Sequence, residues 1–239
     1  MIHMILWAKP KPLDIDGMAD VVYPMLELLK GYGEELDPRY EKVPMKSLAK
    51  EFDFNYASVR ELLRRNLNER QILDTVFSTS NAGFFSSLDD SKSSGVNISI
   101  GRLDPRFNNT CTMQFPEVFS GFLERRDDFV VLFKQLIELF NPYYGFVPEY
   151  ENKPKDITYW EDDKPSSVYW LNYFDKDTAK AIGRWRLLTS KGIERFNDGY
   201  FLRMQDELID IHNPAHLALQ AEWNRKLGLV GFGEQIESD

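Results

Sequence analysis

Cysteine and histidine are scarce in this chain of 239 residues. Cys111 is the single cysteine, which excludes a disulfide within the chain and a metal site built from several thiolates, and fits a reducing compartment. Of the three histidines, His212 and His216 have a spacing that can bind zinc on one face of a helix. Asn213 and Pro214 are typical of a helix start, however, so His212 falls outside that helix. We therefore expect no bound metal.

Long apolar runs are also missing. No stretch approaches the roughly 20 apolar residues that a membrane helix needs. The apolar start of the chain, Met1–Trp7, is shorter than the apolar region of a secretory signal peptide, and lysines and prolines follow it directly. We expect a cytoplasmic protein without a membrane partner.

The common catalytic and nucleotide-binding motifs are absent from the sequence. It contains no Gly-x-Ser-x-Gly elbow, no Walker A loop and no Gly-x-Gly-x-x-Gly turn that joins a strand to a helix. Adjacent carboxylates occur at three places: Asp89 with Asp90, Asp127 with Asp128, and Asp162 with Asp163. A small hydrolase that uses acidic residues therefore stays open as an alternative. The favoured interpretation is a protein with no catalytic activity and no cofactor.

Acidic residues outnumber basic ones by 38 to 29, which gives a formal net charge of -9. Phosphate backbones and anionic lipids are poor partners for such a protein, whereas a basic protein is a good one. The chain nevertheless has one basic cluster, which leaves a nucleic-acid-binding module as a second alternative. Its members are Arg60, Arg64, Arg65 and Arg70. Because Glu61 lies among them, these arginines fit a solvated helix face better, and we expect no direct contact with nucleic acid.

Hydrophobic residues make up 43% of the chain and aromatic residues 14%, enough for a packed core. Apolar residues recur at three- and four-residue spacing over 127–140, which predicts a long amphipathic helix that ends at Asn141 and Pro142. Further helices are predicted at 14–30, 45–52, 56–66, 175–182 and 213–228. Strands are predicted at 1–8, 84–88, 96–100, 110–116, 145–150 and 168–174, with a hairpin over 192–204.

This order of elements predicts an α+β fold, in which helices pack on one face of one or more antiparallel sheets. We expect a single domain over 1–239, because no linker rich in Pro, Gly or Ser divides it. Two halves, 1–120 and 121–232, have a similar order of elements, although their residues show no repeat.

The segment between the strands predicted at 145–150 and 168–174 combines carboxylates with aromatic residues. Rings supply area that can be buried against a partner, and carboxylates attract a basic protein surface. The alternative is that the rings fold back onto the sheet while the acids stay solvated. The candidate contact residues are Glu149, Glu151, Asp156, Tyr159, Trp160, Glu161, Asp162 and Asp163.

Several short motifs, in this order, resemble those of a known family. They are Gly83-Phe84-Phe85, Ile98-Ser99-Ile100-Gly101, the turn Phe140-Asn141-Pro142-Tyr143-Tyr144-Gly145, the run Tyr169-Trp170-Leu171-Asn172-Tyr173-Phe174, and Asn213-Pro214-Ala215-His216. The chain is similar in these features to the immunity protein 52 family of bacterial polymorphic toxin systems, and to type VI secretion immunity proteins. It departs from the pattern at Pro24 and in the long segment 149–164.

The resemblance implies a cytoplasmic inhibitor that binds one toxin or effector, encoded beside it, and blocks the active site of that toxin. Partners of the family are often nucleases. The family carries no catalytic residue, so none is assigned to this chain. Neither the oligomeric state nor the secretion system that delivers the toxin follows from these motifs.

Overall fold

The computed structural model describes residues 2–72, 75–102, 104, 107–116, 125–148 and 164–229, and only the backbone for 69–72 and 75–78. The helices are α1 (Ile15–Gly31), α2 (Tyr56–Arg65), α4 (Arg126–Phe140), α5 (Lys176–Ile182), α6 (Arg184–Leu188) and α7 (Pro214–Leu227). The strands are β1 (Ile2–Ala8), β2 (Tyr40–Glu41), β3 (Asn68–Ile72), β4 (Thr75–Phe85), β5 (Gly95–Ile100), β6 (Asn109–Phe115), β7 (Tyr144–Val147), β8 (Leu171–Phe174), β9 (Ile193–Phe196) and β10 (Gly199–Arg203).

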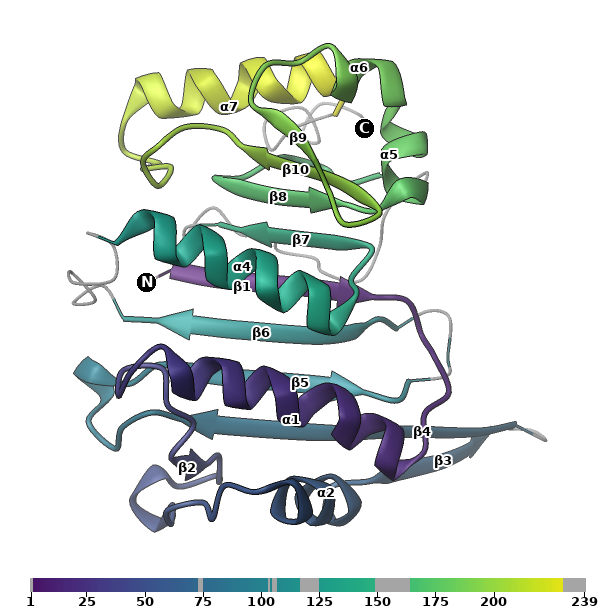
Figure 1. Cartoon of the computed structure of the whole chain (residues 1–239), viewed down its shortest axis with the longest axis vertical. Helices are drawn as coiled ribbons and strands as arrows, with labels where there is room; N and C mark the ends of the chain where they lie inside the picture. Colours follow the sequence, from purple (N-terminus) through teal and green to yellow (C-terminus); the bar gives the residue numbers. More distant parts are fainter. Residues whose placement is uncertain are drawn as a thin grey trace, which may run out of the picture.

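The strands form one ten-stranded sheet in the order β2-β4-β5-β6-β1-β7-β8-β10-β9, with β3 paired to β4 beside this path. The first strand of the chain lies in the middle of the sheet (Figure 1). In β1, Leu6 lies opposite Cys111 of β6 on one side and opposite Gly145 of β7 on the other, both in antiparallel pairing. β1 therefore belongs to the first half of the chain and also pairs with a strand of the second half.

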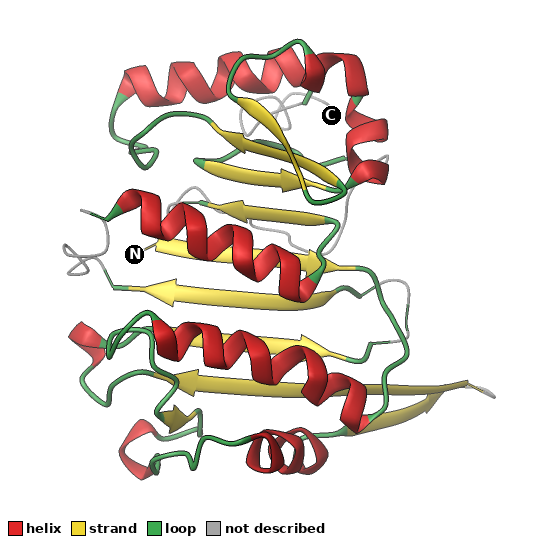
Figure 2. Ribbon diagram, in the orientation of Figure 1, coloured by secondary structure: helices red, strands yellow, loops and turns green. Residues whose placement is uncertain are grey.

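The α+β class with an antiparallel sheet is confirmed. Helices α1 and α4 lie side by side on the same face of the sheet, α1 over β4 and β5 and α4 over the strands around β1 (Figure 2). The apolar stripe predicted for α4 is buried along its whole length. Its buried members are Phe129, Val130, Leu132, Phe133, Leu136, Ile137 and Phe140.

Helix α4 ends because Asn141 adopts the left-handed conformation, with φ of 50°. The chain then enters β7, where Gly145 faces the helix. A Cβ at Gly145 would lie 2.8 Å from Cδ2 of Leu6 and 3.1 Å from Cζ of Phe133. The absence of a side chain at this position is what lets α4 approach the centre of the sheet so closely.

The opposite face of the central strands is a layer of aromatic rings. Trp7 of β1 lies edge-on to Phe146 of β7, with ring centroids 5.1 Å apart, and Phe146 stacks on Tyr169 at 4.9 Å. Tyr144 stacks on Phe174 of β8 at 5.6 Å. Since these rings lie on one face and the α4 side chains on the other, the central strands are buried on both sides.

The helix predicted at 14–30 is confirmed as α1, which begins at Ile15 behind the cap Asp14 and contains Pro24. Other expectations for the first half differ from the structure. The helix predicted at 45–52 is reduced to one 3-10 turn, Lys46–Leu48, none of whose residues is buried. The predicted strand 84–88 is the end of the longer strand β4, which stops at Phe85. The N–H of the next residue, Ser86, donates to the Ser94 carbonyl.

Candidate binding surfaces

The eight candidate contact residues, Glu149, Glu151, Asp156, Tyr159, Trp160, Glu161, Asp162 and Asp163, lie outside the described residues. What the structure places is where the chain enters and leaves this segment. Val147, the last residue of β7, pairs with Leu171, the first residue of β8. The N–H of His3 donates to the Pro148 carbonyl at 3.3 Å. The segment therefore connects two neighbouring strands at one end of the sheet, which we call the loop end.

The chain that returns from this segment is fixed by a buried polar network. Asn224 and Gln220, on successive turns of α7, both reach Ser167 and Val168. The Gln220 amide donates to the Val168 carbonyl at 2.6 Å, and the Tyr144 hydroxyl donates to the Ser167 carbonyl at 3.1 Å. Because buried polar groups are costly without partners, this network sets the path of the chain into β8.

Charged side chains gather around the loop end. Arg203, at the end of β10 and opposite Leu171, lies 2.8 Å from Asp127 and 3.3 Å from Asp206. Arg126 lies 3.7 Å from Glu207. The side chains of Asp127 and Asp206 are 88% and 90% exposed, whereas that of Arg203 is 26% exposed. These carboxylates therefore face solvent at the loop end, beside the arginines that pair with them.

The arginine cluster that suggested nucleic-acid binding is neutralised residue by residue. Arg60 pairs with Asp16, Arg65 pairs with Glu41, and Arg64 lies 2.8 Å from Glu61. The hydrogen bond from Arg60 lowers the pKa of the Asp16 carboxyl, so this acid is ionised at neutral pH. The side chain of Arg70 lies outside the described residues. The three arginines that are described therefore offer little free positive charge to a phosphate backbone.

The cysteine and the described adjacent carboxylates, which were considered for catalysis, are buried, cap a turn or form ion pairs. Burial raises the pKa of the Cys111 thiol from 9.0 to about 12, which keeps it protonated and inert. Asp89 caps a 3-10 turn and accepts hydrogen bonds from the hydroxyl and the N–H of Ser91. These two hydrogen bonds lower the pKa of the Asp89 carboxyl. Asp127 is held by Arg203, and Asp128 lies 3.6 Å from Arg125.

Metal binding finds no support in the part of the chain that is described. Asn213 caps α7 and Pro214 is its first residue, as predicted, so His212 precedes the helix. The Nδ1 atom of His216 accepts a hydrogen bond from the backbone N–H of Asp210 at 3.1 Å. The described residues contain no group of three or more His, Cys, Asp or Glu side chains that could hold a metal ion.

A hollow under β4–β6 and the end of α1 is mostly apolar, and its lining includes Leu29, Phe84 and Met113 but no titratable side chain. Converging carboxylates, which a hydrolase would need, are therefore not found in this hollow. None of the helices within the described ranges is both long and apolar enough to cross a membrane.

One surface feature was missed in the sequence. Trp185 on α6 is 79% exposed, and Leu188 at the end of the same helix is 48% exposed. The helix has five residues, which is too short for an apolar period to show which side is buried. The positive charge of the segment around Trp185 can be read from the sequence, since 176–195 carries six basic residues and two acidic ones.

Comparisons with known proteins identify the fold alone. No protein-family model matches the chain, and no curated protein sequence matches it. Among solved structures, the Pseudomonas aeruginosa T6SS protein PA0821 has a similar fold, with a TM-score of 0.61 and 13% sequence identity. The alignment covers 97% of this chain and 73% of that chain.

Proposed function

We propose that this protein is an immunity protein, which binds a bacterial toxin in the cytoplasm and neutralises it by covering the toxin's active site. The observation that carries the proposal is the likeness of fold to a T6SS protein of Pseudomonas aeruginosa, which extends over 97% of the chain. The motifs that resemble the immunity protein 52 family support the same function from the sequence. An inhibitor of this kind acts by shape and charge and needs no catalytic group of its own.

The acidic composition of segment 149–163 suits this function. The segment connects β7 to β8, and the exposed carboxylates of Asp127 and Asp206 lie at the same end of the sheet. Carboxylates accelerate the encounter with a basic toxin surface, while aromatic anchors such as Tyr159 and Trp160 would supply the buried area. Against a nuclease toxin, the carboxylates would also compete with the phosphates of its substrate.

Co-expression tests the proposal. The toxin domain encoded beside this chain is expressed with an affinity tag, alone and together with this protein. We expect the toxin alone to arrest growth, and we expect co-expression to restore growth and the two proteins to purify as one complex. A toxin that is harmless alone, or a toxin that purifies without this protein, would contradict the proposed function. The control is a catalytically inactive toxin, which does not arrest growth and should still bind this protein.

A further inference from the structure

Trp185 is placed unlike the other described tryptophans. Trp7, Trp170 and Trp223 are between 1% and 5% exposed, whereas Trp185 is 79% exposed, and Leu188 beside it is 48% exposed. An indole is the side chain that most often dominates binding at protein interfaces, because it buries a large area in a single contact. Trp185 and Leu188 therefore offer an apolar contact that no described part of the chain covers.

The backbone that carries Trp185 is held firmly. Leu187 of the same helix and Ile182 of α5 are buried, and both face the core. Arg186 donates from Nη1 to the Leu227 carbonyl at 3.0 Å, which fixes α6 to the last turn of α7. Gly228 lies against this guanidinium, since a Cβ there would be 1.9 Å from Nη1. Because α6 is already ordered, a partner that binds Trp185 does not have to order the helix first.

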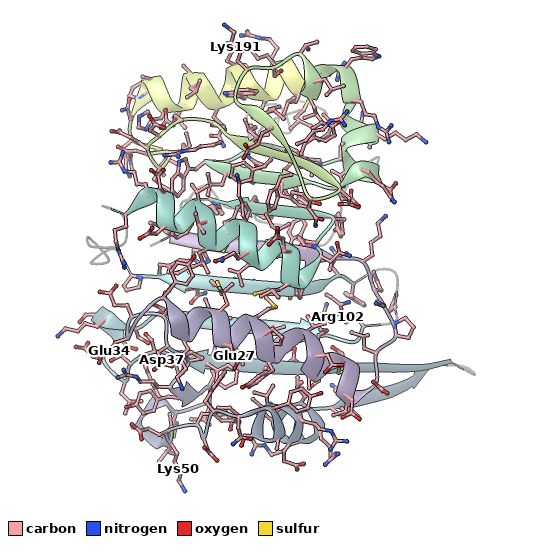
Figure 3. All side chains as sticks on the ribbon, in the orientation of Figure 1. Glu27, Glu34, Asp37, Lys50, Arg102 and Lys191 are labelled. Carbon is pink, nitrogen blue, oxygen red and sulfur yellow. The ribbon has the colours of Figure 1, made fainter. Side chains whose placement is uncertain are left out.

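The charge around Trp185 has the opposite sign to that of the whole protein. Residues 176–195 have a net charge of +4, in a chain whose net charge is -9. Lys180, Arg184 and Lys191 are exposed and form no ion pair among the described residues. Lys191 lies at one extreme of the molecule and Lys50 at the other (Figure 3). Cations this near to an exposed ring in the sequence attract carboxylates and not a second basic surface.

We propose that Lys180, Arg184, Trp185, Leu188 and Lys191, which we call the basic corner, bind an acidic segment of a partner protein. The lysines and the arginine bind its carboxylates, and an apolar side chain of the segment covers the indole. Helices α5 and α6, which carry the other four of these residues besides Lys191, lie at the opposite end of β8 from the loop end (Figure 1). This inference therefore goes beyond the proposed function and adds a second binding surface of opposite charge.

An acidic peptide suits this surface better than a nucleic acid. A long polyanion would approach a protein with a net charge of -9 against its overall field, and three cations neutralise few phosphates. A short acidic segment carries only a few charges and meets only the local field. Stacking on an indole would also suit a single-stranded nucleic acid, so the experiment includes one as a probe.

The experiment follows the indole N–H signals of the full chain by NMR, with the Trp185 signal assigned from its loss in Trp185→Phe. The probes are a synthetic peptide of alternating Glu and Leu, the same peptide with Lys for Glu, and a single-stranded oligothymidine. We expect the acidic peptide to shift the Trp185 signal with a Kd below about 1 mM, and to bind about tenfold more weakly in high salt. The Lys peptide should cause no shift.

Variants make the test specific to this surface. We expect Arg184→Glu to weaken binding about tenfold. We expect the same of Trp185→Ala, whose binding is followed by the backbone amide signals of α6 because the indole signal is lost. Lys50→Glu, which makes the same charge change at the far end of the molecule, should leave the affinity unchanged. An equal loss in Lys50→Glu, no shift up to about 1 mM peptide, or tighter binding of the oligothymidine would each overturn the proposal. Sedimentation could instead show that the chain self-associates and that Trp185→Ala dissociates it. The basic corner would then bind a second copy of the chain, and the proposal would be overturned too.

Discussion

The amide of Asn224 holds the backbone of Val168. Its Oδ1 accepts a hydrogen bond from the Val168 N–H at 2.9 Å, and its Nδ2 donates to Ser167 Oγ at 2.9 Å. Asn224 is 6% exposed, and Ser167 and Val168 are also buried. Helix α7 therefore fixes the point at which the chain returns from the acidic segment 149–163 to the sheet.

Replacing Asn224 with Ala should destabilise the protein markedly. The substitution leaves the Val168 N–H and the Ser167 hydroxyl without this partner in a buried place, which costs about 1–3 kcal/mol per group. We expect urea unfolding to show a loss of about 2–4 kcal/mol. The matched control is Arg225→Ala, the next and exposed residue on α7, for which we expect a change within about 0.5 kcal/mol. Similar losses in both variants would contradict the role of the network.

Replacing Gly145 with Ala tests the close approach of α4 to the sheet. The new Cβ would lie 2.8 Å from Leu6 and 3.1 Å from Phe133, so that side chains or the helix must shift. We expect a loss of about 1–3 kcal/mol in unfolding free energy, as for other overpacked cores. Gly31→Ala is the control, because nothing lies within 4 Å of its Cβ position at the end of α1. That variant should be neutral or slightly more stable; equal destabilisation of both would argue against the packing.

Cys111 should make stability depend on pH at the alkaline end. Burial raises the pKa of its thiol from 9.0 to about 12 in the folded protein, so the folded state holds the proton more tightly. This contribution to stability is complete below about pH 9 and is lost at about 1.4 kcal/mol per pH unit as pH rises towards 12. Unfolding of wild type and Cys111→Ala between pH 8 and 11 measures the difference in slope. Identical slopes would contradict a fully buried thiol.

The helices were the most predictable part of the fold. Helices were predicted to begin at Asp175 and Asn213, and both residues accept backbone N–H groups at the starts of α5 and α7. The apolar spacing from Phe129 to Phe140 is a local property of the sequence, and the structure buries that stripe. Capping and periodicity depend on neighbouring residues alone, which is why these predictions were correct.

The arrangement of strands could not be read in the same way. The pairing of β1 with β6 joins residues about one hundred positions apart, and nothing near Leu6 encodes that choice. The strands β2 and β3 and all of β4 before Phe84 were missed, although Thr75-Val76-Phe77 is rich in β-formers. The exposure of Trp185 depends on how five residues dock onto α7, and no local pattern reports it. The acidic candidate residues are untested, because they lie outside the described ranges.

Charge reversal tests whether the acidic segment contacts the toxin. Changing Glu149, Glu151, Asp162 and Asp163 together to Lys removes the attraction to a basic toxin surface and replaces it with repulsion. We expect the affinity for the toxin to fall by about tenfold or more, mainly through slower association, while the thermal unfolding temperature stays unchanged. Surface plasmon resonance measures the two rate constants separately.

The control for this variant changes the same net charge elsewhere. Glu27, Glu34, Glu35 and Glu51 are exposed acids in the first half of the chain, and Figure 3 shows Glu27 and Glu34 away from the loop end. Reversing these four should slow association only slightly, through the weaker overall field. An equal effect of both sets would mean that net charge alone matters, and an effect confined to the control set would move the interface to the first half.

The central claim is that this protein inactivates a toxin by binding it, and titration of toxin activity tests that claim most directly. Purified protein is added in increasing amounts to the purified toxin domain encoded beside it, and the toxin's own reaction is measured at each step. The account predicts that activity falls to background at an equimolar ratio, without consumption of the toxin's substrate by the added protein. Full toxin activity in the presence of excess protein would contradict the account.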